Sequence, residues 1–368
     1  MIAGVDMLTI DKRIAEHFSN VKQVFLYITD RCNLACDYCL YKSHTTFQLH
    51  TQEIEAQLAK KLILTFRNMG AVKLSIIGGE PTLYDIENGN RGLFDIISYS
   101  KRIGYSYVRM DTNGVFQQCI LDDANLMKLD ELSFSIDSHD EALNDSCRGH
   151  CSLSRALPNL LYAIKRGYHV DVTMCIHRLN SGRDTDSRLM ALNTINALYE
   201  YGVKRINIHP VLRVGIPRDT WTSHACLEVE EWLLIRKELE EAYECGQFPL
   251  EVRIPTRFIT DQEHSSNPKY YGYCSVRMGE RILIHPDGII RCCALLIGTP
   301  YGIGRYDETS IVWDTSRTNE LYGRDLDLWT PCPIQRLDDN SIVPLCISFK
   351  PGQGEYVWSK ELDWDSRS

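Results

Sequence analysis

The stretch VFLYITDRCNLACDYCLY, residues 24–41, decides the fold and places the chemistry. Its first six residues, VFLYIT, are apolar and rich in β-branched and aromatic side chains, which predicts a buried strand over 24–29. Three cysteines follow directly, Cys32, Cys36 and Cys39, in the spacing C-x3-C-x2-C. In barrel-like α/β folds, the loops after the carboxyl ends of the strands carry the functional residues. The triplet therefore marks the functional end of the first strand.

Further along the chain, short β-rich runs alternate with amphipathic helical stretches. The predicted strands after the first cover 73–79, 107–114, 131–138, 169–177 and 205–211. The predicted helices lie at about 52–69, 91–103, 152–166 and 184–201, with a weaker one near 122–128. Repeated βα units imply a parallel sheet with right-handed crossovers. Six units predict a partial (β/α)6 barrel, similar to an incomplete TIM barrel, and not a closed eight-stranded one.

The character of the chain changes after residue 250. Residues 227–246 form an amphipathic helix that ends at Gly246, and the remainder is rich in Pro, Gly, Tyr, Trp and Cys. The sequence predicts one hairpin there, in which RILIH and IIRCC are joined by a turn at 286–288. We therefore predict three parts, with a boundary near 250–270: an N-terminal extension (1–22), a barrel (23–250) and a small, irregular, Cys-rich domain (251–368).

Composition narrows the class of protein. The chain has 368 residues, 44% of them hydrophobic, a net charge of −9 and 14 cysteines. The net charge disfavours broad nucleic-acid binding, which leaves a basic footprint. No apolar run is long enough to span a membrane, and the charged N-terminus does not resemble a signal peptide, so a cytoplasmic location is expected. In a large chain without an export signal, cysteines are expected to serve metals and not disulfides.

The cysteine triplet allows two metal sites. A structural zinc site needs a fourth ligand, for which His44 is the best nearby candidate. Three closely spaced thiolates also suit an iron–sulfur cluster, in which one iron then stays open for a further ligand. The spacing favours the iron–sulfur cluster.

Two further motifs lie at strand ends. The second strand ends in Gly78-Gly79-Glu80-Pro81, which by itself is consistent with an ordinary turn. The fourth strand reads SFSID over 133–137, and alternation places Ser133, Ser135 and Asp137 on one face. Because polar groups on a buried strand are costly unless hydrogen-bonded, this row indicates an interior ligand.

Taken together, these motifs resemble the radical S-adenosylmethionine (SAM) superfamily over roughly residues 22–215. The resemblance implies a partial (β/α)6 barrel and a [4Fe–4S] cluster whose open iron chelates SAM. The cluster reduces SAM to a 5′-deoxyadenosyl radical, which abstracts hydrogen from the substrate. Cys32, Cys36 and Cys39 would ligate that cluster, and Tyr38 occupies the position of an aromatic residue whose backbone contacts adenine.

The resemblance also implies which residues bind SAM. Gly78 and Gly79 would let its methionine moiety approach the backbone, and Glu80 would pair with its ammonium group. The remaining expected SAM-binding residues lie at the ends of the third and fourth strands and in the Arg-Gly pair at 148–149. They are Thr112, Asn113, Ser135, Asp137 and Arg148. The sequence DTNG at 111–114 is equally consistent with a plain Asn-Gly turn.

The cysteines after residue 250 resemble the opening of the SPASM and twitch domains that follow some radical SAM barrels. Cys274, Gly288 and Cys293 fit their pattern C-x(9–15)-G-x4-C, although a shift of one residue would select Cys292. The second half of a full SPASM signature is absent. The shorter twitch arrangement, with one auxiliary [4Fe–4S] cluster, would add Cys332 and Cys346 as ligands.

The expected reaction is dehydrogenation or epimerisation of a small metabolite such as an amino sugar, cyclitol or nucleoside, with a flavodoxin or ferredoxin as electron donor. Only about 22 residues precede the first strand, and many maturases of ribosomal peptides carry a longer recognition domain there. A peptide substrate remains the alternative, and a non-enzymatic iron–sulfur or zinc protein a remote one. The terminal WDSRS lacks the Gly-Gly tail of the GTP-cyclising relatives, which argues against that activity.

Overall fold

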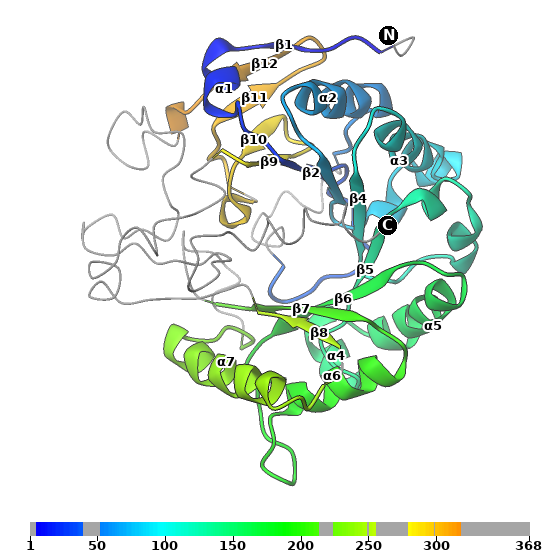
Figure 1. The fold of residues 1–368 in the computed structure, drawn as a ribbon, viewed down its shortest axis with the longest axis vertical. Helices are drawn as coiled ribbons and strands as arrows, with labels where there is room; N and C mark the ends of the chain where they lie inside the picture. The colour runs from blue at the N-terminus through cyan, green and yellow to red at the C-terminus, as the bar shows by residue number, and fades with distance from the viewer. Residues whose placement is uncertain are drawn as a thin grey trace.

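The computed structural model describes residues 5–39, 52–212, 224–248, 250–254, 279–297 and 299–317. In this part of the chain, one mixed sheet curves into an open barrel with helices on its outer face (Figure 1). The strand order is β1-β12-β11-β10-β9-β2-β3-β4-β5-β6-β7-β8. The strands are β1 (Thr9–Ile10), β2 (Gln23–Tyr27), β3 (Lys73–Ile77), β4 (Tyr107–Thr112), β5 (Glu131–Ser135), β6 (Val170–Ile176), β7 (Arg205–Pro210), β8 (Glu251–Arg253), β9 (Arg281–Ile284), β10 (Ile289–Arg291), β11 (Gly304–Tyr306) and β12 (Ser310–Trp313).

The helices connect these strands. They are α1 (Lys12–His17), α2 (Ala56–Asn68), α3 (Arg91–Arg102), α4 (Glu141–Arg148), α5 (Ser152–Lys165), α6 (Met190–Glu200) and α7 (Val229–Glu244). Several begin with an acidic cap: the Glu55 carboxylate accepts from two backbone N–H groups at the start of α2. Among the described helices, none combines the length and the apolarity that crossing a membrane requires.

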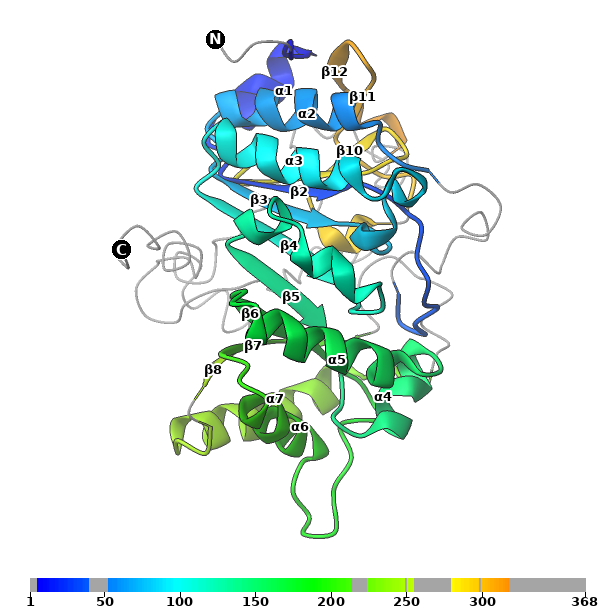
Figure 2. The same ribbon diagram turned by 90° about the vertical axis from the view of Figure 1, so that its right-hand side faces the viewer.

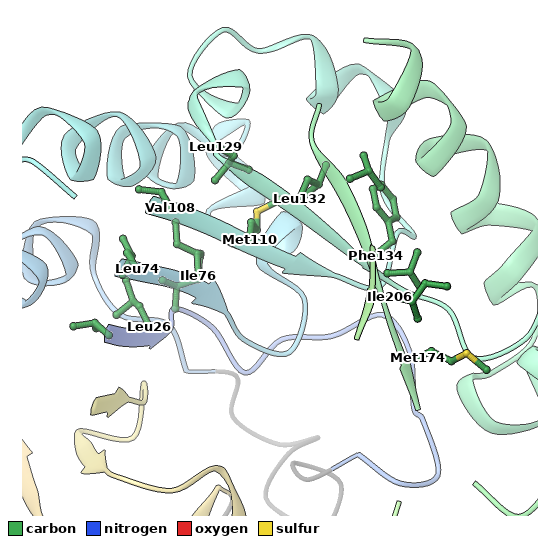
Figure 3. Close-up of a cluster of buried hydrophobic side chains, with 14 of the residues drawn as sticks. Leu26, Leu74, Ile76, Val108, Met110, Leu129, Leu132, Phe134, Met174 and Ile206 are labelled. Carbon is green, nitrogen blue, oxygen red and sulfur yellow. The ribbon is translucent and has the colours of Figure 1, made fainter. Parts of the chain in front are cut away.

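The strands from β2 to β8 are all parallel, as the repeated βα units predict. The six predicted strands are confirmed, and β8 adds a seventh at the edge. Their outward-facing side chains form the apolar layer beneath the helices (Figure 3). Leu74, Met110 and Phe134 are fully buried in this layer, on three successive strands. Each such side chain contributes on the order of 1.5–3 kcal/mol of burial free energy, so this layer holds the barrel together.

Local hydrogen bonding explains where the helices differ from the prediction. The helix predicted over 184–201 begins only at Met190, because the Asp184 carboxylate holds a turn by accepting from the backbone N–H groups of Asp186 and Arg188. The weak helix predicted near 122–128 is two short 3-10 turns. The sequence did not predict α4, because eight residues are too few to show a clear helical period.

The C-terminal hairpin is confirmed, and it extends the barrel sheet. Strand β9 lies parallel to β2, with Val24 opposite Ile282, and β10 returns antiparallel to β9. The hairpin turn contains Gly288 at φ 77°. Strands β11 and β12 continue the sheet to β1 from the N-terminal extension (Figure 1). The sheet therefore crosses the predicted boundary between the barrel and the Cys-rich domain, and residues 255–278, which join the two, lie outside the described residues.

Candidate active site

The cysteine loop leaves the carboxyl end of β2 and crosses the end of the barrel. The Asn33 side-chain amide donates to the Val115 carbonyl at 2.6 Å, beyond the end of β4. The Asp37 backbone N–H donates to the Cys147 carbonyl on α4 at 2.8 Å. Figure 2 shows this segment, in dark blue, running from β2 toward α4. The loop is thus attached to the segment after β4 and to α4, both at the carboxyl edge of the sheet.

The three thiols of this loop are not arranged as the ligands of one tetrahedral ion. Cys32, Cys36 and Cys39 are each partly buried. A single tetrahedral zinc ion would hold its sulfur ligands within about 4 Å of one another. Among the described residues, these cysteines do not form a set of ligand atoms within 4.8 Å of one another. The zinc candidate His44 lies outside the described residues.

Burial keeps two of these thiols, those of Cys32 and Cys36, protonated until a metal binds. Burial raises the pKa of Cys32 to about 12, although the Leu34 N–H group opposes the shift. Burial also raises the pKa of Cys36 to about 11, against the opposing charge of Arg148. Metal binding would therefore displace protons from these thiols.

The glycine pair at the end of β3 packs against the base of the cysteine loop. The Gly79 N–H donates to the Thr29 carbonyl, and the Glu80 N–H to the Arg31 carbonyl, both at 2.8 Å. A Cβ atom on Gly78 would lie 2.5 Å from the Thr29 carbonyl oxygen, and one on Gly79 would lie 2.3 Å from that of Arg31. The chain's own backbone therefore requires glycine at both positions, whatever else approaches them.

Glu80 joins the ends of β3 and β4. Its Oε1 accepts from the Thr112 hydroxyl at 2.7 Å and from the Thr82 hydroxyl at 2.8 Å. Its Oε2 accepts from the Asn113 N–H at 2.6 Å. Burial raises the pKa of Glu80, and the hydrogen bonds to Asn113, Thr112 and Thr82 oppose that shift. The carboxylate thus fixes the relative position of two strand ends beside the cysteines.

Asn113 links this corner to the cysteine loop. Its side-chain amide donates to the side-chain Oδ1 of Asn33 at 2.8 Å and points to the Cys32 sulfur at 3.7 Å. Gly114 follows at φ 80°, where a Cβ atom would lie 2.7 Å from that of Ala156. The turn predicted at 111–114 is therefore present, and it also supports the loop that carries the cysteines.

A second buried cluster lies across the barrel, at the end of β5. The Asp137 carboxylate accepts from the Tyr38 hydroxyl, from Arg148 at 3.4 Å and from the Cys175 N–H at 2.8 Å. Both Asp137 and Arg148 are buried. Arg148 also donates to the Tyr38 hydroxyl at 3.2 Å. The buried Nε of Arg148 has no hydrogen-bond partner among the described residues. The structure thus brings Tyr38, Asp137 and Arg148 together.

The polar face predicted on β5 is present. Phe134 and Ile136 are buried on the side of the helices, and the Ser133 hydroxyl hydrogen-bonds that of Thr173 on the neighbouring strand β6 at 3.1 Å. Ser135 is partly buried at the end of the strand, and pairs in register with Thr173.

Inside the barrel lies a network of charged side chains that was not predicted from the sequence. Arg109 on β4 donates to Asp111 at 2.7 Å, to Glu131 on β5 at 2.8 Å and to Asp171 on β6 at 3.3 Å. Arg205 on β7 donates to Glu131 as well. The positive charge of Arg109 contributes to holding the pKa of Glu131 low against the effect of burial, whereas burial raises that of Asp171. Charged residues at every second position of buried strands share one face, and this pattern could have predicted the network.

His177 gives the site an acid-sensitive group. Its ring is fully buried, stacks on Tyr38 and lies 3.6 Å, at Nδ1, from the Cys147 sulfur. Burial lowers its pKa, although Asp137 opposes the shift. A histidine whose pKa is lowered by folding adds stability at pH values above its unfolded pKa, near 6.5, and this stability is lost as the pH falls.

We expect the unfolding free energy of wild type to fall more than that of His177→Gln from about pH 7 to about pH 5, measured by urea unfolding. Parallel curves would contradict this assignment.

Of the C-terminal cysteines, the structure places two. Cys292 and Cys293 follow β10 and are both buried. Burial raises the pKa of Tyr27 on the inner side of β2, and the charges of Asp111 and Cys293 raise it further. The charge of Cys293 therefore acts on Tyr27. Cys274, Cys332 and Cys346 fall outside the described residues.

Known proteins resemble both the sequence and the fold. Residues 26–190 match the model of the Radical SAM superfamily. A probable GTP 3′,8-cyclase of Sulfurisphaera tokodaii is 24% identical over 274 residues, which cover 74% of this chain and 81% of the relative. That of Saccharolobus solfataricus is also 24% identical, over 72% of this chain and 80% of its own length.

Two solved structures share the fold. SuiB of Streptococcus suis, bound to the precursor peptide SuiA, superimposes with a TM-score of 0.58 at 15% identity, over 88% of this chain and 68% of SuiB. The structure of anSMEcpe with bound AdoMet superimposes with a TM-score of 0.55 at 14% identity, over 77% of each chain.

The open parallel barrel and its cysteine loop thus define a domain of the class that uses a [4Fe–4S] cluster and SAM. The chain is an enzyme that carries a radical SAM domain over residues 26–190. The family and the fold expected from the sequence are confirmed, and the non-enzymatic alternative is wrong.

Proposed function

We propose that Cys32, Cys36 and Cys39 hold the SAM-binding cluster, and that the enzyme dehydrogenates or epimerises a small polar metabolite. When bound, the cluster and SAM supply a 5′-deoxyadenosyl radical that removes a hydrogen atom from the substrate. The three thiols suit this role because they are partly buried in the loop that leaves the carboxyl end of β2, and three protein ligands leave one iron of a four-iron cluster without a protein ligand. One iron would then remain open for SAM.

The residues around the loop would position SAM. In this proposal Gly78, Gly79 and Glu80 place backbone groups beside its methionine moiety, at the end of β3. Glu80 holds Thr112 and Asn113 next to the same edge. Across the barrel, Ser135 and Asp137 end β5, and the unpartnered Nε of Arg148 is a donor available to a carboxylate. Tyr38 would reach adenine through its backbone, because its hydroxyl is bound to Asp137.

The polar barrel interior supports a small polar substrate, and it carries this proposal. Arg109, Asp111, Thr173 and Asn207 line neighbouring strands with hydrogen-bonding groups. Hydroxyl, amino and base groups would find hydrogen-bonding partners there, whereas an apolar substrate would make no hydrogen bond to these groups. Within the classes proposed, an amino sugar, a cyclitol or a nucleoside, the likeness to GTP cyclases favours the nucleoside.

Peptide modification is the second candidate. The fold superimposes on SuiB in its complex with a precursor peptide. A peptide would enter between β8 and β1, where the sheet formed by the described strands does not close.

Both candidates are tested with reconstituted, anaerobic enzyme. SAM, dithionite and deuterated nucleosides, amino sugars, cyclitols or short peptides are supplied, and 5′-deoxyadenosine is quantified by mass spectrometry. We expect a nucleoside or sugar to stimulate its formation and to transfer deuterium to it, with Cys36→Ala as the inactive control. Stimulation by peptides alone would contradict a small-metabolite substrate and support peptide modification instead. Equal 5′-deoxyadenosine from wild type and Cys36→Ala would contradict the cluster assignment.

We further propose an auxiliary [4Fe–4S] cluster held by Cys274, Cys293, Cys332 and Cys346, which would accept an electron from the substrate radical. The buried position of Cys293 after β10, close enough for its charge to affect the pKa of Tyr27, supports it. A flavodoxin or ferredoxin would reduce the SAM-binding cluster. We expect the triple variant Cys32/Cys36/Cys39→Ala to retain about four iron atoms after reconstitution. Iron analysis near zero would exclude the auxiliary cluster.

A further inference from the structure

A second group of metal-ligating side chains lies outside the proposed active site, where α4 gives way to α5. Asp145, His150 and Cys151 place one ligand atom each within 4.8 Å of one another. Among the described residues, no other group of three or more His, Cys, Asp or Glu side chains meets this distance. We propose that this group binds one divalent ion of the zinc class.

The backbone brings these side chains together. Gly149 has φ 116° and Cys151 has φ 56°, a conformation that residues with a side chain rarely adopt. This turn places the adjacent His150 and Cys151 side chains side by side, with Nε2 at 3.2 Å from Sγ. Zinc–nitrogen and zinc–sulfur bonds in a tetrahedral site would place such atoms about 3.6 Å apart. The spacing therefore needs little change to accept an ion.

Asp145 is held ready as the third ligand. Its Oδ1 accepts from the Ser152 hydroxyl at 2.7 Å and from the Leu153 N–H at 3.1 Å, and its Oδ2 accepts from the Cys151 N–H. These hydrogen bonds lower the pKa of Asp145, against the effect of burial, so it is ionised at neutral pH. A carboxylate oriented by such bonds is the usual support of a metal ligand.

The ligand chemistry identifies the class of ion. Thiolate, imidazole and carboxylate together suit zinc, whereas calcium and magnesium prefer oxygen ligands alone. His150 is exposed, and Asp145 and Cys151 are partly buried, so an ion can enter from solvent. Three protein ligands leave a fourth position for water.

The ion would brace the turn that supports the cysteine loop. Cys147 and Arg148 lie within this segment, and their carbonyls accept from the Asp37 N–H at 2.8 Å and from the Cys36 thiol at 3.7 Å. Figure 2 shows α4 and α5 packed together at this end of the barrel. The site is separate from the proposed cluster, since none of its three ligands belongs to the cysteine loop.

Cobalt titration of the reconstituted holoenzyme tests the site, because tetrahedral Co²⁺ reports its ligands by absorption. We expect wild type to bind one Co²⁺ with thiolate charge-transfer and d–d bands, and Zn²⁺ to displace it. Cys151→Ser and His150→Gln should each weaken binding at least about tenfold, and Cys151→Ser should remove the charge-transfer band. The control Cys119→Ser alters an exposed cysteine elsewhere and should bind as wild type does.

His150→Gln keeps the test independent of folding, since it changes an exposed side chain in a turn and its circular dichroism should match wild type. Absence of Co²⁺ binding by wild type with an intact cluster would overturn the proposal. Binding by Cys151→Ser and His150→Gln with wild-type affinity would overturn it equally.

Discussion

Gly79→Ala is expected to reduce the rate of SAM cleavage by about a hundredfold, mainly because the substitution would misplace the cysteine loop. The new Cβ would lie 2.3 Å from the Arg31 carbonyl oxygen and 2.6 Å from that of Asp30. Both atoms are backbone, so they cannot rotate away, and β3 and the segment leading to Cys32 would have to separate by about 1 Å. A misplacement of this size typically costs two orders of magnitude in rate.

The measurement is 5′-deoxyadenosine formation, with iron content determined on the same sample. Gly182→Ala is the matched control, because its Cβ would meet only the Met190 sulfur, at an ordinary 3.6 Å. We expect this control to keep wild-type iron content and rate. A Gly79→Ala enzyme that matches it in both would show that the close approach to Arg31 is unimportant.

Asp137→Ala should destabilise the protein by about 3–5 kcal/mol, the range found when one partner of a buried ion pair is removed. Asp137 is fully buried, and its loss leaves the buried Arg148 guanidinium without its counter-charge. It also leaves the Tyr38 hydroxyl and the Cys175 N–H without their acceptor. Since Tyr38 lies between Cys36 and Cys39, the cysteine loop should loosen at the same time.

Urea unfolding measures the free energy, and iron content after reconstitution reports the loop. Asp137→Asn, which keeps the shape and loses the charge, should lie between wild type and Asp137→Ala. Asp122→Ala removes an exposed pair with Arg166 and should cost less than about 1 kcal/mol. Equal losses for Asp137→Ala and Asp122→Ala would mean that the buried pair adds no stability beyond an exposed one.

Much of the fold could be predicted because it depends on local patterns. The strand that precedes Cys32 and the polar row Ser133, Ser135 and Asp137 follow from residue type and from a period of two. The short helix α4 was missed because one amphipathic turn or two is indistinguishable from a loop. The hairpin at 281–291 was found, but its pairing with β2 was not, because strand partners are set by packing between distant segments.

For the candidate site, the sequence by itself determined the chemistry: three thiols at C-x3-C-x2-C after a buried strand, a glycine pair with Glu80, and polar residues at two further strand ends. These are properties of residue type and spacing, which survive in the unfolded chain. Only the tertiary structure decided which groups meet: Gly79 with Arg31, Asp137 with Tyr38 and Arg148, Asp145 with Cys151. Such contacts depend on how the barrel bends and on how turns direct side chains, and no local pattern encodes either.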